Sequence, residues 1–239
     1  MTRTSRMPAT LADSLHRQLS SYALAASAAG VGLLSLSKPA QAGIIYTPSH
    51  RVIHGTNANP KPVPLSLTHD GGVEFEFLDA WFVDEDFGPT GWLTIFPVHS
   101  LNGVEGHTVN SGTLYDSALT AGARVGPSVR FYPNISNAAM CGAHVSSRSA
   151  LWCGVRGHYL GLKFAIKGKI HYGWARLDIE VDKRAHITAT LTGYAYETIP
   201  NKPIVAGKTH GPDVIMVRDA SLGHLAQGAS AIPAWRRSK

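Results

Sequence analysis

The stretch that decides the fold is residues 158–198, HYLGLKFAIKGKIHYGWARLDIEVDKRAHITATLTGYAYET. Its first part alternates apolar side chains (Leu160, Leu162, Phe164) with polar or small ones, and an alternation of period two is typical of a β-strand. Lys167-Gly168 follows directly, and a two-residue segment ending in Gly predicts a tight hairpin turn. The opening of this stretch therefore predicts a strand, a turn and a strand that returns.

The returning strand changes its pattern midway. Ile170, Tyr172 and Trp174 share one phase, and the apolar series that begins at Ala175 has the other. A one-residue slip in alternation is what a β-bulge produces, so the sequence predicts a bulge at Gly173-Trp174. A third strand is expected from residue 187 to 196. Three adjacent antiparallel strands predict an all-β fold in which this meander belongs to an antiparallel β-sandwich or jelly roll.

Shorter strand patterns extend upstream from this meander. Residues 44–47, 51–54, 73–78 and 91–98 are rich in β-branched and aromatic side chains, whereas residues 99–127 are rich in Gly, Ser, Asn and Thr. The former predict strands and the latter predict long connections. No amphipathic helix is expected after residue 43. The sequence therefore predicts one β-domain over residues 43–212, a length that an all-β fold uses as a single unit.

Residues 1–42 have the three parts of a secretory signal peptide. Arg3, Arg6 and Arg17 precede an uncharged run, and the run ends in Ala40-Gln41-Ala42, a small-residue cleavage site ahead of Gly43. This predicts a helical signal peptide cleaved between Ala42 and Gly43, and an exported protein that is extracellular, on the cell surface or periplasmic. A retained membrane anchor is the alternative, but the 15-residue apolar core is shorter than the roughly 20 residues of a spanning helix.

Charge and cysteine content fit an exported chain. The full chain has 22 basic and 16 acidic residues, but four bases and one acid belong to the predicted signal, so the mature chain is only weakly basic. This excludes a basic footprint for nucleic acid. The two cysteines, Cys141 and Cys153, predict a disulfide in an oxidising compartment, with two free thiols as the alternative. A zinc site is not expected at this spacing, because no matching His pair accompanies them.

Three motifs carry a family resemblance: YGWAR at residues 172–176, YAYE at 194–197, and Ile204 with Ala206-Gly207. They resemble exported bacterial proteins that often end in an exosortase-type (PEP-CTERM) sorting tail. The resemblance covers residues 158–208 and implies a secreted β-sandwich-like domain, without implying any chemistry.

The C-terminal residues 213–239 resemble a degenerate form of such a tail. Residues 220–234 lack formal charge and precede Trp235-Arg236-Arg237, but Asp219-Ala220-Ser221 stands where the sorting motif is expected. The uncharged run is too short to span a bilayer, so no stable transmembrane span is expected in the mature chain. A working anchor and an ordinary disordered end are the alternatives.

Seven of the acidic residues lie between Asp70 and Asp86. Clustered carboxylates are ligands for Ca²⁺, and Asp70, Asp84 and Asp86 are the candidates. The simpler interpretation is a solvated strand face and a polar loop, because a full set of six to eight oxygen ligands is not visible. We therefore expect no cofactor and little or no calcium binding.

No catalytic motif stands out in the sequence. There is no His-Glu-x-x-His, no Gly-x-Ser-x-Gly and no glycine-rich phosphate loop. Trp81 and Trp152 lie in segments expected to be loops, where an exposed indole is suited to stack on a sugar. The sequence thus predicts an exported protein with a structural or binding role and no catalysis. The alternative is a carbohydrate-binding or carbohydrate-cleaving module whose partner is an envelope glycan or polysaccharide.

Overall fold

Every regular element that the structure describes is a β-strand. The computed structural model describes residues 43–55, 57–108, 114–133 and 139–217, and these segments contain 15 strands and no helix. The all-β class is therefore confirmed. The predicted signal peptide, including Ala42, and residues 218–239 lie outside the described residues.

The strands form two main sheets and one small pair. The larger sheet has the order β15-β1-β13-β12-β11-β5-β6, with β8 also paired to β5; the smaller has the order β10-β9-β4-β3-β2; β14 pairs with β7. In chain order the strands are β1 (Ile44–His54), β2 (Val63–Leu65), β3 (Phe75–Asp84), β4 (Gly88–Pro97), β5 (Gly103–Thr108), β6 (Leu114–Asp116), β7 (Arg124–Val125), β8 (Phe131–Tyr132), β9 (Cys141–His144), β10 (Arg148–Ser149), β11 (His158–Ile166), β12 (Lys169–Val181), β13 (Ile187–Glu197), β14 (Ile204–Val205) and β15 (Val214–Met216).

The predicted meander is the centre of the larger sheet. β11, β12 and β13 pair antiparallel in sequence order, and the β11–β12 register runs without interruption to Ile166↔Lys169. Lys167 and Gly168 both have positive φ, 50° and 77°. Positive φ at both central residues is the requirement of a type I′ turn, so the predicted hairpin is confirmed.

The predicted bulge at Gly173-Trp174 is wrong. The β12 alternation continues unbroken, with Ala175 and Leu177 on the same face, and the pairing with β13 skips Thr192 instead. The pairing of β1 with β13 also shifts register at Thr192. The sequence misleads here because Trp174, on the opposite face of β12, is also completely buried. The apparent change of phase reflects a strand covered on both faces.

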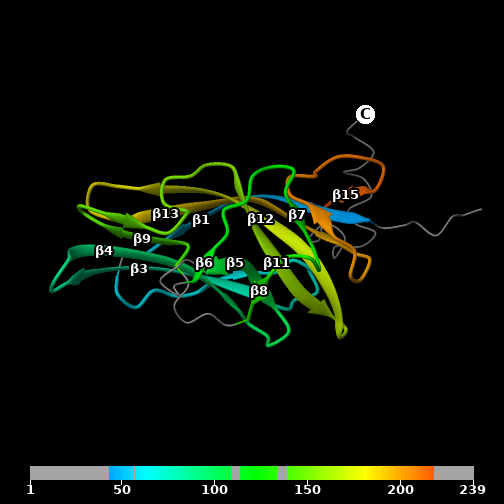
Figure 1. Ribbon diagram of the computed structural model, residues 1–239, viewed down its shortest axis with the longest axis horizontal. Coiled ribbons are helices and arrows are strands. Elements are labelled where there is room, and N and C mark those ends of the chain that lie inside the picture. The colour runs from blue at the N-terminus through cyan, green and yellow to red at the C-terminus, as the bar shows by residue number, and fades with distance from the viewer. Residues whose placement is uncertain (1–42, 56, 109–113, 134–138, 218–239) are drawn as a thin grey trace, which may run out of the picture. The chain divides into compact units, whose positions relative to one another are not determined.

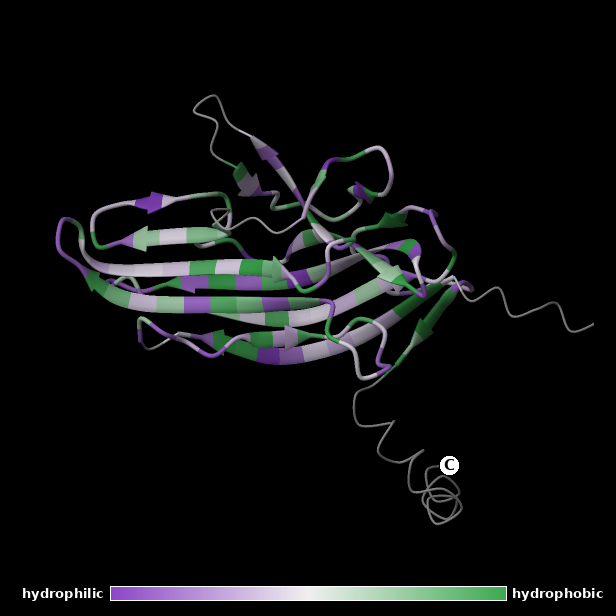
Figure 2. Cartoon of the chain, turned by 90° about the horizontal axis from the view of Figure 1, so that it is seen from below, coloured by the Kyte–Doolittle hydropathy of each residue, from purple (hydrophilic) through white to green (hydrophobic). Residues whose placement is uncertain are grey.

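Two apolar clusters explain that double coverage. The main cluster lies between the sheets and includes Phe75 and Leu93 from the smaller sheet with Leu160 and Leu177 from the larger. A second cluster covers the other face of the larger sheet around Trp174. Figure 1 shows β1, β12 and β13 in one layer with β3 and β4 below them. In Figure 2 hydrophobic and hydrophilic bands alternate along the long strands, as expected for sheets with distinct faces.

Residues 99–127 differ most from the sequence-based expectation. They were expected to be connections, but they contain β5, β6 and β7. Glycine weakens a strand pattern, yet Gly106 is required here because a Cβ would lie 2.7 Å from the carbonyl oxygen of Tyr115. Packing against neighbouring strands therefore forms β5 despite its low intrinsic preference for a strand.

The paired chain extends past the boundary predicted at residue 212. β15 pairs in parallel with the start of β1, and the amide of Ile44 donates to the carbonyl oxygen of Asp213 over 2.7 Å. Val214 also packs against the second cluster. Residues 213–217 are consequently part of the sheet rather than of a separate tail.

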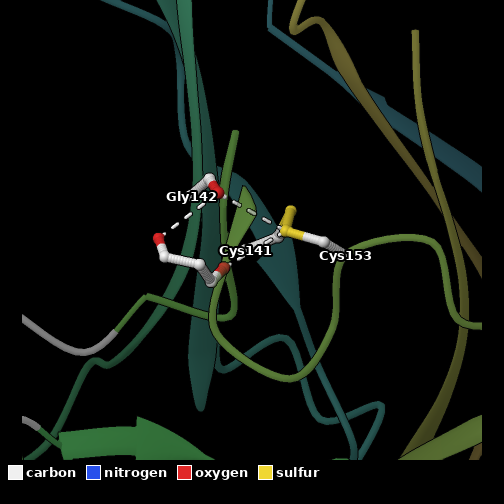
Figure 3. The surroundings of a disulfide bond; sticks show 4 residues. Cys141, Gly142 and Cys153 are labelled. Atoms are coloured by element: carbon white, nitrogen blue, oxygen red, sulfur yellow. Dashed lines mark hydrogen bonds between the residues drawn. A yellow bond between two sulfur atoms is a disulfide. The ribbon is translucent and has the colours of Figure 1, made fainter. Parts of the chain in front are cut away.

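The predicted disulfide is confirmed. Cys141, in β9, and Cys153, in the loop after β10, are bonded with their Cα atoms 5.0 Å apart. Figure 3 shows the disulfide with Gly142 next to it, and the carbonyl oxygen of Gly142 accepts a hydrogen bond from the Ser149 hydroxyl over 3.3 Å. The disulfide therefore fixes the β9–β10 hairpin to the following loop.

Candidate functional site

A group of polar and aromatic side chains lies where β1 ends, β3 passes, and the β12–β13 turn of the larger sheet packs onto the smaller sheet. We call this group the His54–His186 cluster, and it consists of His54, Asp79, Trp81, Asp182, His186 and Thr188.

Asp182 organises the β12–β13 turn. Its Oδ1 accepts hydrogen bonds from the amides of Arg184 (2.8 Å) and His186 (2.9 Å), and its Oδ2 lies 3.0 Å from Nδ1 of His186. Burial opposes its charge, but the hydrogen bonds with His186 and Arg184 outweigh it and hold the pKa of Asp182 below the usual value. One carboxylate thus shapes the turn and orients the imidazole.

The turn packs directly onto the smaller sheet. A Cβ on Gly91 of β4 would lie 2.1 Å from the carbonyl oxygen of Ala185, so only glycine permits this approach. Trp81 of β3 donates its indole N–H to the carbonyl oxygen of Arg184 over 2.9 Å. The Trp81 ring stacks on His186 with centroids 4.6 Å apart and planes 18° apart. These contacts fix His186 between the two sheets.

His54, the last residue of β1, faces the start of β13. Its Nδ1 lies 3.0 Å from the carbonyl oxygen of Ile187 and 3.0 Å from the Thr188 hydroxyl. A carbonyl oxygen only accepts, so Nδ1 of His54 carries the hydrogen and the neutral ring has its lone pair on Nε2. The same reasoning applies to His186, whose Nδ1 faces a carboxylate. Their ring centroids are 6.2 Å apart.

Asp79 is a buried carboxylate with one unused oxygen. Its Oδ2 accepts the amide of Gly55 over 2.8 Å, whereas Oδ1 is buried without a hydrogen-bond partner. Burial raises the pKa of Asp79 to about 6, against the opposing effects of that amide and of His54 and His186. A buried acceptor without a partner is costly to retain, which favours a site that a ligand completes.

Two pockets meet at His54. One has a volume of about 290 Å³ and is lined by His54, Glu180, Val181, Asp182, His186 and Thr188. The other, of about 170 Å³, is lined by His54, Asp79 and residues of the β1–β2 connection. Both imidazoles therefore line a pocket, whereas the unpartnered Oδ1 of Asp79 is buried beneath the surface.

A larger pocket of about 340 Å³ lies beside the β13 bulge, and His69 and Tyr194 line it. Nε2 of His69 is 2.8 Å from the Thr47 hydroxyl, and the ring stacks on Tyr194 with centroids 5.7 Å apart. Arg51, also in the lining, donates to the carbonyl oxygen of Pro64. Because these groups already bind protein atoms, this pocket offers less unused chemistry than the His54–His186 cluster.

The two tryptophans predicted to stack on a sugar, Trp81 and Trp152, lie in different environments. Trp81 lies in a strand rather than the expected loop, and it belongs to the cluster. Trp152 is 0% exposed in the main core and donates its indole N–H to the carbonyl oxygen of Asp116 over 3.2 Å. Its assignment as a sugar-stacking platform is therefore wrong, because the ring has no exposed face.

The three acidic candidates for calcium do not converge. Asp70 precedes β3 and accepts hydrogen bonds from the amide of Gly72 and from the Thr68 hydroxyl, which lower its pKa. Asp84 ends β3 and caps the next turn by accepting the amides of Asp86 and Phe87. Asp70 precedes the ten-residue strand β3 and Asp84 is its last residue, so roughly 30 Å of strand separates them. Within the described ranges, no group of three or more His, Cys, Asp or Glu side chains is placed to hold a metal ion.

Sequence reasoning missed most of the cluster. His54 and His186 are 132 positions apart, and only the β1–β13 register brings His54 opposite Thr188. Besides Trp81, which the sequence offers as a candidate, Asp182 gives a local signal, because an Asp two residues before Arg184 is typical of a side-chain-capped turn.

Comparison of the chain with protein families, with curated proteins and with solved structures finds no match. In the part of the chain that the structure describes, no helix has the length and apolar character needed to cross a membrane.

Proposed function

We propose that this chain is an exported protein of the bacterial envelope or exterior, with a β-sandwich-like domain that binds a ligand at the His54–His186 cluster and has no catalytic role. Three features support export: the signal-like residues 1–42, the Cys141–Cys153 disulfide, and the resemblance of residues 158–208 to exosortase-sorted proteins. The sandwich description is supported by an apolar cluster that both main sheets share.

One observation supports the binding role. The N–H donors of the cluster bond to protein oxygens, whereas some of its acceptor atoms have no hydrogen-bond partner. The ring N–H of His54, the ring N–H of His186 and the indole N–H of Trp81 all donate to protein oxygens. Among the described residues, the hydrogen bonds of both imidazoles are made at Nδ1, and Oδ1 of Asp79 is buried without a partner. A ligand that satisfies them must supply hydrogen-bond donors or positive charge. Among the described residues that line the two adjoining pockets, there is no Ser or Cys to serve as a nucleophile.

The alternative is a carbohydrate-binding or carbohydrate-cleaving module. Sugar hydroxyls are donors that suit the same acceptors, and Trp81 supplies an aromatic ring in the cluster. His186 stacks on that ring, so any sugar contact at Trp81 involves the ring edge or the face that His186 leaves open.

Ligand screening with matched variants tests the proposal. The exported protein is applied to an array of envelope glycans and to isolated envelope polysaccharide, with Trp81→Ala and His186→Ala as site variants. Phe87→Ala is the control, because Phe87 is an exposed aromatic residue in the β3–β4 turn outside the cluster. We expect binding that both site variants lose and the control retains. Binding that survives both site variants would place the site elsewhere and overturn the proposal.

A further inference from the structure

We propose that the pocket of about 340 Å³ beside the β13 bulge, here called the bulge pocket, binds an organic carboxylate with an apolar body through Arg51. This second site goes beyond the proposed function. It shares no lining residue with the two pockets at His54, and its ligand is an anion rather than a donor of hydrogen bonds or a cation.

The irregular pairing of β1 with β13 forms the floor of the bulge pocket. The register shifts between Pro48 and Arg51, where Thr192 of β13 is left out of the ladder. Leu191 and Tyr194 are three positions apart, so they would point to opposite faces of a regular strand. Instead both line the pocket and both belong to the main cluster, at 1% and 6% exposed. The bulge therefore brings two large buried side chains to one face, and bulges are frequent next to functional sites for this reason.

The loop between β2 and β3 forms another wall. His69 has a φ of 57°, a left-handed conformation that is uncommon for a residue with a side chain, and its ring stacks on Tyr194. Strained backbone of this kind clusters at ligand sites, where surrounding contacts hold it in place. Gly71 also lines the pocket, with a φ of 90°, and a Cβ there would meet no atom within 4 Å. The loop is therefore held by the His69 ring and leaves open space at Gly71.

The charge of the lining decides the class of ligand. Among the described residues that line the bulge pocket, Arg51 is the one Lys or Arg, and there is no Asp or Glu. By contrast, Glu180 and Asp182 line the larger pocket of the His54–His186 cluster. Asp70 is close to the bulge pocket in sequence but is not part of its lining. A singly charged anion is therefore favoured, because one guanidinium group attracts and balances one carboxylate.

Arg51 supplies the hydrogen-bond donors for that anion. Its Nη1 donates to the carbonyl oxygen of Pro64, which also lines the pocket. This bond uses one of several N–H donors in a planar fork, and such a fork binds a carboxylate through two parallel hydrogen bonds. The Ser49 hydroxyl is a further donor in the lining. Donors beside the floor of Leu191 and Tyr194 suit a small ligand with one charged end and one apolar end, which is the usual composition of a small-molecule site.

Calorimetric titration of phenylacetate into the exported protein tests the inference, with 2-phenylethanol as a neutral ligand of similar shape. We expect saturable binding of one phenylacetate per chain and at least tenfold weaker binding of the alcohol. Arg51→Gln should weaken phenylacetate binding at least tenfold. Arg148→Gln, which changes an exposed arginine in β10, should not.

Three results would overturn the inference. They are the absence of saturable phenylacetate binding, equal binding of the acid and the alcohol, and phenylacetate binding that Arg51→Gln leaves unchanged. Arg51→Lys is a sharper variant because it keeps the positive charge and removes the planar fork. We expect it to weaken phenylacetate binding, since an ammonium group does not form the two parallel hydrogen bonds.

Backbone amide spectra keep the test decisive if an Arg51 variant fails to fold. In the wild-type protein phenylacetate should shift the amide signals of Gly71 and Leu191, and shifts confined to residues outside the lining would count against the site. Trp81→Ala and His186→Ala should bind phenylacetate as tightly as the wild type. Loss of phenylacetate binding in either variant would move the anion to the His54–His186 cluster and overturn the inference. The glycan test of the proposed function is read separately, so the two proposals fail independently.

Discussion

Two buried carboxyl groups outside the candidate site show how single residues set the pH dependence of this fold. Glu105 and Asp116 each have a buried oxygen without a hydrogen-bond partner. Burial raises the pKa of Glu105 to about 7 and that of Asp116 to about 8. In the unfolded chain both groups titrate near pH 4. The native state therefore retains protons that the unfolded state releases.

This difference predicts that stability falls as pH rises. Below about pH 4 both states are protonated, and above it only the unfolded state loses its protons, so the free energy of unfolding decreases up to pH 7–8. For Glu105 the shift corresponds to roughly 3 kcal/mol. Urea unfolding of the wild type between pH 5 and 8 should show this decline, and Asp116→Asn should flatten it while raising stability at pH 8. Glu85→Gln, at an exposed position, is the control. A wild-type stability that increases from pH 5 to 8 would contradict the assignment.

At the scale of elements, the shortest strands and the loops are stabilised by bonds to other parts of the chain. The disulfide joins β9 to the loop after β10, across a sequence separation of 12. Constraining a loop of this length stabilises the folded state by about 3 kcal/mol in the chain-entropy account. Replacing both Cys141 and Cys153 by Ala should lower the free energy of unfolding by about that amount, as measured in urea. A peptide map of the untreated protein should contain the linked pair, and two alkylatable thiols would refute the bond.

β15 supports a second prediction at this scale. Beyond its ladder with β1, the amide of Val217 donates to the carbonyl oxygen of Tyr46 over 2.8 Å. Truncation after Pro212 should therefore destabilise the protein by about 1–3 kcal/mol, the sum of a few hydrogen bonds and the burial of Val214. Truncation after Val217 retains β15 and should have little effect on the melting temperature. Equal melting temperatures for the two truncations would mean that β15 contributes nothing.

These elements also show what the sequence was able to predict. The β11–β12 hairpin followed from the alternation around Lys167-Gly168, because turn chemistry and period are local. The bulge at Thr192 was misplaced because burial of Trp174 depends on residues that pack over the sheet from elsewhere in the chain. Likewise, Trp81 was recognised as a candidate, but its partner His186 is more than 100 residues away. Local patterns predict strands, whereas sites between strands depend on pairing that no local pattern encodes.

For the whole molecule, export is the prediction with the widest consequence. Gly43 is the first described residue and is buried, with its carbonyl oxygen accepting from the amide of Thr198 over 2.8 Å. We expect mass spectrometry of the exported protein to find Gly43 as the N-terminus, because residues 40–42 form the expected cleavage site. Recovery of the chain with Met1 intact would contradict cleavage. Substituting Ala42 by a bulky residue should block processing and cause the precursor to accumulate.

The order of strands in the larger sheet governs when this protein is able to fold. Among the described strands, the partners of β1 are β13 and β15, whose residues follow it by more than 130 positions. Contacts this distant in sequence form slowly, because closing so large a loop is entropically costly before any pairing compensates. During synthesis the first strand has no partner until almost the entire chain has left the ribosome. For the export proposed above, this strand order would keep the chain open while a translocation channel requires an unfolded substrate, and the sheet would be completed only on the far side.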